Sequence, residues 1–570
     1  MECSSFLQID TIREGFYNLA MIKSLSVTVS PKDEKNESLI RSLIVKELKK
    51  NRISYKKMAP VFEKKSIDAR HGQVKLHLKF SVYLDDDVDK AGNGNITGSG
   101  TSSSAAFVLP EWKKADGKHS VLIIGAGPAG LFGALKLLEK GIKPVIIERG
   151  AETSQRKKDI ALISRENIVN EDSNYCFGEG GAGTFSDGKL YTRSNKRGNI
   201  QEILATFVHF GADPKILTDA HPHIGTDRLP QVINAMREKI LECGGEIHFN
   251  TRCTELIIEG DSVKGVRTVN VTSEAPGAAG RDFLADAVIL ATGHSALDVY
   301  SMMARCAPQG LEAKTFAAGV RVEHPRALID SIQFHGNKEQ AEILGAAEYR
   351  LITQVDERGV YSFCMCPGGF VVPSSSGPDE IVVNGMSAAK RNSKWSNAAI
   401  VVEIRPEDIP AEYKRKAEEA GCPALAGLFF RTAIEASAKK QGKGQAAPAQ
   451  RLTDFLANRP SKDFPQSSYT PGLVSSNLNE WLPPHICNRL TKAFPIFNKM
   501  MRGYVCDDAL MIAVETRTST PVRISRNPDT FESTALRNLY PAGEGSGYAG
   551  GIVSSAMDGQ NCCKKLMQKF

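Results

Sequence analysis

Residues 121–130 read VLIIGAGPAG, an apolar run that ends in three glycines spaced GxGxxG. The run predicts a buried strand, and Gly125 permits the tight turn that follows it. Gly127 lets the backbone approach a pyrophosphate, and Gly130 lets the next helix pack closely on the strand. Pro128 suits the first turn of that helix, whose free N–H groups and positive dipole end favour phosphate. The stretch predicts the start of a Rossmann-type βαβ unit.

A second strand with an acid at its end completes the motif. Residues 145–148 read VIIE, which places Glu148 23 residues beyond Gly125, where a ribose-binding acid belongs. Arg149 follows it directly. Because strand, turn, helix, strand and acid occur in this order, the prediction is much more specific than a lone GxGxxG. The motif itself does not separate FAD from NAD.

Three later segments favour FAD. Residues 177–189, FGEGGAGTFSDGK, form a loop whose glycines allow backbone approach to a flat ligand. Residues 287–293, AVILATG, predict a strand that re-enters the dinucleotide domain. Residues 538–544, NLYPAGE, predict a strand ending at Glu544, followed by glycines and a helix from Ile552. Glu544 is expected to accept from the ribityl chain, and the helix N-terminus to stabilise negative charge on the reduced ring.

These segments together give one set of predicted FAD-binding residues. The set comprises Gly125, Gly127, Pro128, Ala129, Gly130, Glu148, Arg149, Gly180, Gly181, Thr184, Ser186, Lys189, Thr292, Gly293, Gly543, Glu544, Gly551 and Ile552.

Two residues are candidates for a catalytic role. Arg517 lies between small hydroxyl residues, and a guanidinium is a natural partner for a carboxylate or a reduced flavin. An ordinary salt bridge, with Glu515 or elsewhere, is an equal alternative for Arg517. His294 directly follows the ATG segment and is a candidate acid or base, although a lone histidine is more often structural.

The cysteines predict neither a metal site nor a dithiol relay of the CxxxxC kind. Cys176 stands alone before the glycine-rich loop. Cys364 and Cys366 share a face if they lie on a strand, but a disulfide at this spacing is geometrically marginal. Packing thiols are therefore favoured over a redox pair.

The pattern along the chain predicts an α/β protein: a Rossmann-type FAD-binding domain with an inserted α+β domain and a small N-terminal α/β domain. In the small domain a helix is expected around Glu37–Lys50, and the stretch 439–450 is expected to be a mobile surface loop. The expected divisions are an extension at 1–20, the small domain at 21–85, a flexible linker at 86–117, the first part of the FAD domain at 118–304, an inserted substrate or cap domain at 305–504, and the closing part at 505–570.

Composition and charge limit the function classes. The longest apolar runs are of strand length and the N-terminus lacks the pattern of a signal peptide, so a cytoplasmic protein without a membrane anchor is expected. The net charge of +7 is concentrated between Lys46 and Lys79, which predicts a docking face for a protein partner or a solvated surface. Nucleic acid is the less favoured partner, because this patch lacks interleaved aromatic residues.

Several short segments of the chain are more specific than these general patterns. They are KKSIDAR at 64–70, the loop at 177–190, AGVRVEHP at 318–325, YSFCMCPGG at 361–369 and ETRTS at 515–519. With these segments, the chain resembles an uncharacterised family of FAD-dependent dehydrogenases, related in their cofactor domain to fumarate-reductase and glutathione-reductase flavoproteins. The resemblance implies a small N-terminal α/β domain, a bound FAD and an oxidoreductase activity, but no substrate.

The expected function is an FAD-dependent dehydrogenase or reductase that transfers a hydride between flavin N5 and a small organic substrate. The sequence contains one complete dinucleotide-binding motif, which is assigned to FAD, and no second motif of this kind is apparent for NAD(P)H. NAD(P)H is therefore expected at most as a transient electron donor. The alternatives are an FAD-dependent RNA-modifying or RNA-binding protein that uses the basic N-terminal domain, and a flavin-bearing sensor or scaffold.

Overall fold

The computed structural model describes residues 22–69, 74–91, 96, 107–192, 198–272 and 280–570. Contacts within the chain divide it into two compact units. The smaller unit is drawn from residues 1–67 and 75–106, and the larger from residues 68–74 and 107–570. The predicted extension at 1–20 and residues 92–95 and 97–106 of the predicted linker lie outside the described residues.

The smaller unit contains a three-stranded sheet, in which the first and third strands are antiparallel, and an α-helix, which confirms the predicted small α/β domain. The helix begins after Asn36, whose side chain accepts a hydrogen bond from the Leu39 N–H at 3.1 Å. It buries Ile40, Ile44 and Leu48. The elements are β1 (Ile22–Val29), α1 (Glu37–Lys50), β2 (Met58–Asp68) and β3 (Lys75–Leu84), in the sheet order β1-β3-β2.

A five-stranded parallel sheet forms the centre of the cofactor domain, as the sequence predicts. Its order is β22-β10-β4-β5-β6. The strands are β4 (Ser120–Ile124), β5 (Lys143–Ile147), β6 (Glu246–His248), β10 (Ala287–Leu290) and β22 (Leu539–Pro541). The chain moves from β4 outward to β5 and β6, and then crosses back to β10 on the other side of β4. The strand order therefore reverses at β4, the position where open α/β sheets bind ligands at the carboxyl ends of their strands.

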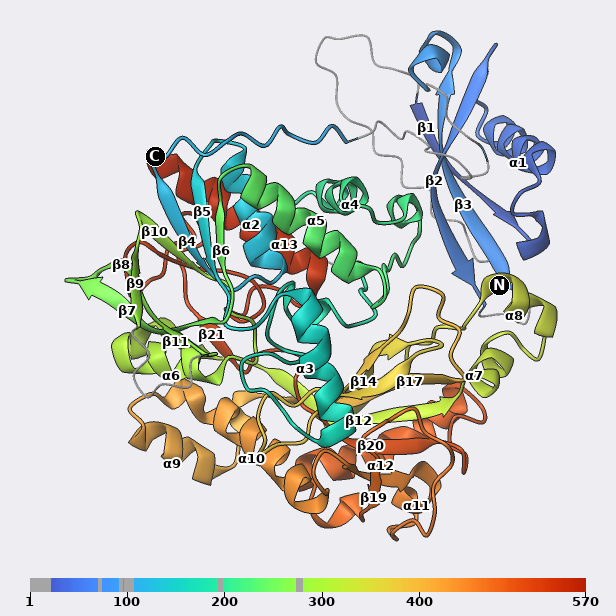
Figure 1. Cartoon of the computed structure of the whole chain (residues 1–570). Coiled ribbons are helices and arrows are strands. Elements are labelled where there is room, and N and C mark those ends of the chain that lie inside the picture. Colours follow the sequence, from blue (N-terminus) through green and yellow to red (C-terminus); the bar gives the residue numbers. More distant parts are fainter. Residues whose placement is uncertain (1–21, 70–73, 92–95, 97–106, 193–197, 273–279) are drawn as a thin grey trace. The chain divides into compact units, whose positions relative to one another are not determined.

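Alternate residues of β4 point to opposite faces of this sheet, as expected for a strand buried on both sides. Val121 and Ile123 pack in a cluster with helices on one face, while Leu122 and Ile124 pack in the cluster on the other. The first face is covered by α2 (Pro128–Leu138), α4 (Ile200–His209), α5 (Leu229–Glu242) and α13 (Ile552–Leu566), grouped against the sheet in Figure 1. The second carries α6 (Leu297–Cys306) and a small sheet of β7 (Thr251–Glu259), β8 (Ser262–Asn270) and β9 (Arg281–Leu284).

Glycines bring α2 and α13 unusually close together. A Cβ added to Gly559 of α13 would lie 2.1 Å from the carbonyl oxygen of Ala129 in α2. A Cβ added to Gly133 of α2 would lie 3.2 Å from the sulfur of Cys563 in α13. Because both helices begin beside the carboxyl ends of the central strands, this packing positions two helix N-termini at one edge of the sheet.

The inserted domain is a seven-stranded sheet with helices, in the order β13-β14-β17-β12-β20-β18-β19. Neighbouring strands are antiparallel except β18 and β19. Its strands are β12 (Phe316–Pro325), β13 (Ile352–Val355), β14 (Arg358–Cys366), β17 (Trp395–Ile404), β18 (Ala447–Arg451), β19 (Leu473–Ser475) and β20 (Leu510–Glu515). Its helices are α7 (Arg326–Gln333), α8 (Lys338–Leu344), α9 (Ala411–Glu419), α10 (Ala426–Gln441), α11 (Leu452–Leu456) and α12 (Pro484–Met500).

Two small pairs and one further helix complete the larger unit. The pairs are β11 (Leu311–Ala313) with β21 (Val522–Ile524) and β15 (Phe370–Pro373) with β16 (Val383–Met386), and the helix is α3 (Thr153–Glu166).

Three sequence-based expectations about boundaries are corrected by these elements. The predicted closing part at 505–570 begins too early, because β20 pairs with β12 and β18 inside the inserted sheet. The sequence of a fully buried strand such as β20 does not indicate which sheet it joins. The predicted loop at 439–450 is instead the end of α10, a tight turn and the buried strand β18. The last residues of the predicted linker bind the cofactor domain, where the Lys113 N–H donates to the Leu138 carbonyl at 2.9 Å.

Candidate functional site

A cavity of about 940 Å³ lies at the carboxyl ends of β4, β5, β10 and β22 and extends to β14 and β16 of the inserted domain. Both candidate catalytic residues, Arg517 and His294, line it. The predicted FAD-binding residues that line it are Gly125, Gly127, Pro128, Ala129, Glu148, Arg149, Gly181, Ser186, Lys189, Thr292, Gly293, Gly543, Glu544, Gly551 and Ile552.

The remaining members of the set, Gly130, Gly180 and Thr184, support the walls of the cavity from behind. A Cβ on Gly130 would lie 2.0 Å from the carbonyl oxygen of Gly125, so this close packing requires glycine. The Gly180 N–H donates to the Ala126 carbonyl at 2.9 Å and ties the glycine-rich loop to the first turn. Thr184 is buried, and its hydroxyl donates to the Glu179 carbonyl at 3.0 Å.

Bare backbone forms the part of the cavity wall where phosphates are expected. Gly127 is the N-cap of α2 and Gly551 is the N-cap of α13, and neither end has a side-chain cap. A Cβ on Gly181 would lie 3.0 Å from the Gly127 Cα, so the glycine-rich loop lies directly against the first turn. Uncapped N–H groups at a helix start attract anions. This wall therefore suits the pyrophosphate of a dinucleotide.

One buried hydroxyl gives independent support for a polar ligand. Ser295 lines the cavity after the ATG segment, is 5% exposed, and its Oγ has no hydrogen-bond partner. Buried polar atoms in folded proteins are almost always hydrogen-bonded. A ligand with hydroxyl or carbonyl groups, such as FAD, would satisfy Ser295. No local sequence pattern indicates this role for Ser295, apart from its position two residues after Gly293.

Glu148, predicted to bind the ribose, also fastens three backbone segments. Its Oε2 accepts from the Ala126 N–H at 2.8 Å, and its Oε1 accepts from Gly150 at 2.9 Å and Gly178 at 3.0 Å. A carboxylate offers about four lone-pair positions, so one remains for a ligand hydroxyl. Glu148 thus joins the first turn, the end of β5 and the glycine-rich loop.

Glu544 and His294 face each other across the end of the cavity, with Nδ1 of the imidazole 3.8 Å from Oε1 of the carboxyl group. Burial raises the pKa of Glu544 to about 7, opposed by the charge of Lys314. Burial lowers the pKa of His294 to about 3, and the nearby guanidinium groups of Arg431 and Arg517 lower it further. His294 is therefore uncharged at neutral pH, which suits a hydrogen-bonding role better than general acid catalysis.

Arg517 is held in a buried ion-pair cluster. Its Nη2 lies 2.5 Å from Glu380 and 2.9 Å from Glu435, and its Nη1 donates to the Ser376 hydroxyl at 2.8 Å. Thr516 donates to Glu435, so the flanking hydroxyl steadies the carboxylate rather than the guanidinium. Of the two interpretations of Arg517 from the sequence, the buried salt bridge is present, with partners that the sequence did not identify. Glu515, the partner considered there, pairs with Arg321 at 2.7 Å.

An ion-pair network that the sequence does not predict lies along the cavity and includes Lys189, one of the predicted FAD-binding residues. Arg391 pairs with Asp187 at 2.7 Å and with Glu348 at 2.6 Å. Lys189 lies 3.6 Å from Asp187, and His221 lies 3.0 Å from Glu348. Arg391 follows β16 at a large distance in sequence from the glycine-rich loop, so no local pattern connects the two.

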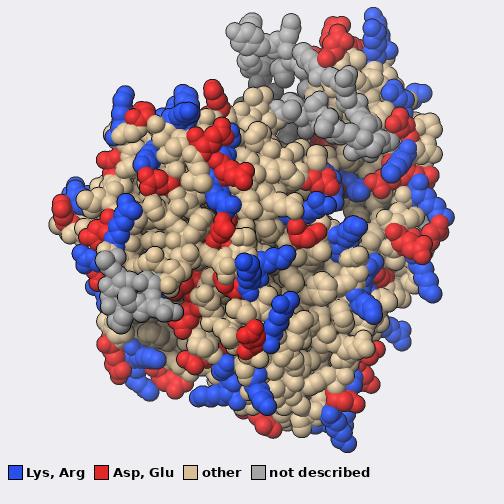
Figure 2. All heavy atoms as spheres, viewed as in Figure 1, with Lys and Arg blue, Asp and Glu red and all other residues tan. Residues whose placement is uncertain are grey.

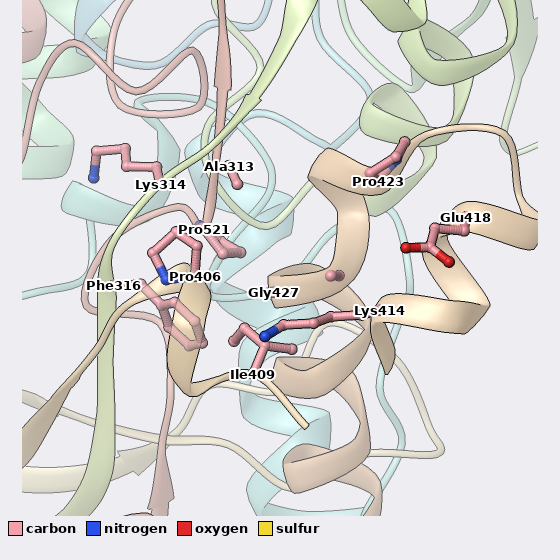
Figure 3. Close-up of a pocket in the computed structure, with 11 residues that line it drawn as sticks. Ala313, Lys314, Phe316, Pro406, Ile409, Lys414, Glu418, Pro423, Gly427 and Pro521 are labelled. Carbon is pink, nitrogen blue, oxygen red and sulfur yellow. The ribbon is translucent and has the colours of Figure 1, made fainter. Parts of the chain in front are cut away.

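A second, smaller cavity of about 220 Å³ lies in the inserted domain between the start of β12, α9 and α10 (Figure 3). Its walls include the apolar side chains of Phe316, Ile409 and Pro521. The ammonium group of Lys414 donates to the Glu407 carbonyl at 3.1 Å. This cavity contains none of the predicted site residues.

Within the described ranges, no helix is both long and apolar enough to cross a membrane.

Comparison with protein families finds three matches along the chain. Residues 118–279 match an FAD binding domain, and residues 315–518 match the family described as FAD-dependent protein, C-terminal domain-like. Residues 21–83 match a domain of unknown function. The second match includes β20, in agreement with the extent of the inserted sheet.

Among curated proteins, an uncharacterized protein of Clostridium beijerinckii is 39% identical over 458 residues, which cover 80% of this chain and 81% of that protein. A digeranylgeranylglycerophospholipid reductase of Methanosarcina acetivorans is 29% identical over 160 residues. That match covers 27% of this chain and 34% of the reductase, so it spans about a third of that enzyme.

Two solved structures are among the matches. CtdE in complex with FAD is 12% identical, with a TM-score of 0.29 over 78% of this chain and 81% of that chain. Mycobacterium smegmatis Sdh1 in complex with UQ1 is 14% identical, with a TM-score of 0.32 over 79% of this chain and 68% of that chain.

Proposed function

The chain belongs to an uncharacterised family of FAD-dependent proteins, and we propose that it is an oxidoreductase that transfers a hydride between flavin N5 and a small organic substrate. The proposal rests on the cavity of about 940 Å³, which is lined both by the predicted dinucleotide site and by the inserted domain. The inserted domain contributes residues of β14 and β16 to its wall. Enclosed, mostly apolar cavities with a few polar groups are the usual substrate sites of such enzymes.

The chain's own residues would bind and orient the two ligands. The uncapped starts of α2 and α13 would hold the negative charges of FAD, and Ser295 and Glu148 would bind its hydroxyl and carbonyl groups. The flavin, when bound, supplies the hydride chemistry. Tyr361 and Phe363 of β14 would form an apolar wall for the substrate.

An anaerobic substrate screen tests this function. The purified FAD-loaded protein is mixed with candidate two-electron donors, NADH and NADPH among them, and the absorbance of the oxidised flavin is followed. At least one donor is expected to bleach the flavin rapidly, and an acceptor to restore the absorbance. If dithionite bleaches the flavin but no organic donor does, the oxidoreductase proposal is wrong, and a sensor or scaffold is the better account.

For the smaller unit we propose a protein partner. Part of its positive charge is already paired, as Lys65 lies 2.8 Å from Glu34 and Lys79 lies 3.1 Å from Glu63. Figure 2 shows Lys and Arg side chains interspersed with Asp and Glu over the visible face of the molecule. A surface on which positive and negative charges alternate binds the negative phosphates of a nucleic acid less well than a uniformly basic surface does. RNA affinity that falls steeply with salt would instead favour the RNA-modifying alternative.

A further inference from the structure

The strand β14 carries two cysteines into the cavity at a break in its pairing. The register between β14 and β17 shifts between Phe363 and Cys366, which marks a β-bulge. Cys364 lies in the bulge with φ +43°, a left-handed conformation that is uncommon for this residue. Both Cys364 and Cys366 line the cavity. Bulges are frequent beside active sites because they re-aim side chains.

Two cations face the sulfur of Cys366. The Nζ of Lys189 and the Nη1 of Arg321 each lie 4.0 Å from this sulfur. Lys189 belongs to the glycine-rich loop on the FAD side of the cavity, and it also donates to the carbonyl of Met365. Arg321 donates to the carbonyl of Cys364 at 3.3 Å, so it holds the bulge in place. The two cations therefore hold the segment that carries the two cysteines from two sides.

Both cations also have carboxylate partners. Arg321 pairs with Glu515 at 2.7 Å. Lys189 lies 3.6 Å from Asp187, which is itself paired with Arg391 at 2.7 Å. These ion pairs hold the two cations beside the Cys366 sulfur.

We propose that Cys364 and Cys366 are a redox-active dithiol that exchanges two electrons with the flavin across their shared cavity. The inference rests on the proposed oxidoreductase function and extends it with a second redox centre. Its substrates would be thiols or disulfides that reach the cavity from solution.

The exchange balances with groups already named. The thiols of Cys364 and Cys366 form one S–S bond, and both S–H bonds break. The dithiol loses two electrons and two protons, which an oxidised flavin would take up. In the other direction the disulfide gains two electrons and two protons from a reduced flavin and opens to two thiols. Cys364 is the exposed member of the pair and Cys366 the buried one.

The spacing of the two residues permits the bond. Residues two apart on an extended strand have Cα atoms about 6.6 Å apart, near the upper limit for a disulfide. An extended chain gives the greatest separation, so any bend in the bulge shortens it. The Cys366 thiol already donates to the Cys364 carbonyl at 3.3 Å. A bond at the limit of favourable geometry opens readily, which suits a catalytic rather than a structural disulfide.

Counting electrons tests the proposal without a substrate. The FAD-loaded protein is oxidised in air, made anaerobic and titrated with dithionite until the flavin is fully reduced. The disulfide should raise the requirement from about two electrons per FAD to about four, since each centre is a two-electron couple. In parallel, thiols are counted after denaturation, and the reduced protein should contain about two more than the oxidised one.

Variants separate this dithiol from other thiols. Cys364→Ser and Cys366→Ser should each need about two electrons per FAD and show no redox-dependent thiol pair. Cys306→Ser changes an exposed cysteine outside the cavity and should behave as the wild type. A wild-type requirement of two electrons with an unchanged thiol count would overturn the dithiol proposal even if the variants fail to fold. Failure of the oxidoreductase proposal is distinguishable, because the metabolite screen would then be negative while the flavin still accepts electrons from dithionite.

Discussion

At the scale of single residues, Arg517 is the sharpest case of a residue whose role depends on its partners. Its guanidinium is bonded to two buried carboxylates, so it brings little net charge to the flavin. Arg517→Ala removes the ion-pair partner of Glu380 at 2.5 Å and leaves Glu435 with Arg431 at 3.7 Å, and breaking a buried ion pair in this way costs about 3–5 kcal/mol. We predict a loss of that size in the free energy of unfolding, measured in urea.

The same substitution should change the sulfite affinity of the flavin much less than it changes the stability of the protein. Sulfite adds to flavin N5 and leaves an anionic ring, so its affinity reports the local charge. In the FAD-loaded Arg517→Ala protein this affinity should stay within about threefold of wild type, below ~1 kcal/mol. A large loss of sulfite affinity with normal stability would restore Arg517 to the flavin site.

Glu544 should make the stability of the FAD-free protein depend on pH. Its pKa is about 7 in the folded protein because of burial, and about 4.3 for an unfolded glutamate. Between these values the folded state binds more protons than the unfolded state, so the free energy of unfolding falls as pH rises through this window. The loss is about 1–3 kcal/mol and is complete above pH 7.

Glu544→Gln should remove this slope, so that the variant gains on the wild type between about pH 4.5 and pH 7.5. Urea unfolding of the FAD-free proteins across this range measures the effect. Glu259→Gln, which changes an exposed residue of β7, is the matched control. Parallel pH profiles for Glu544→Gln and the wild type would contradict the assigned burial of this carboxyl group.

At the scale of elements, the contact of α2 with α13 should be required for both stability and FAD binding. Gly559→Ala places a methyl group against the backbone of Ala129, and overpacking of this kind costs about 1–3 kcal/mol. Because both helices begin at the cavity, the dissociation constant for FAD should rise as well. Gly133→Ala, whose methyl group would lie 3.2 Å from the sulfur of Cys563 and 3.7 Å from the carbonyl oxygen of Gly559, should have a smaller effect on both measurements. Equal effects of the two variants would mean that the close approach is unimportant.

Some of the helices and strands could be predicted from the sequence, and others could not. The strand from Val121, the strand from Val145 and the helix from Ile552 are confirmed as elements, because local patterns specify them. The sheet that β20 joins could not be predicted, because a fully buried strand fits either sheet. The partners of Arg517 and Arg391 come from distant strands and helices, so no local pattern reveals them.

At the scale of the whole molecule, the two compact units predict independent folding. A shortened chain that begins at Phe107 should bind FAD with an affinity within about threefold of the full chain, below ~1 kcal/mol. This follows because every residue that lines the 940 Å³ cavity comes from the larger unit. Fluorescence titration with FAD compares the two proteins. A shortened chain that folds, by circular dichroism, but fails to bind FAD would contradict the division.

The most direct test of the account is FAD binding by Gly127→Val. Gly127 lies where α2 begins, and valine there would fill the space between the first turn and the glycine-rich loop, 3.8 Å away at Gly181. Gly377→Val, where an added Cβ meets nothing within 4 Å, is the control. Each protein is stripped of cofactor and titrated with FAD by calorimetry. The account predicts one FAD per chain for the wild type and Gly377→Val, and no measurable binding for Gly127→Val. Wild-type affinity in a folded Gly127→Val protein would contradict the placement of FAD in this cavity.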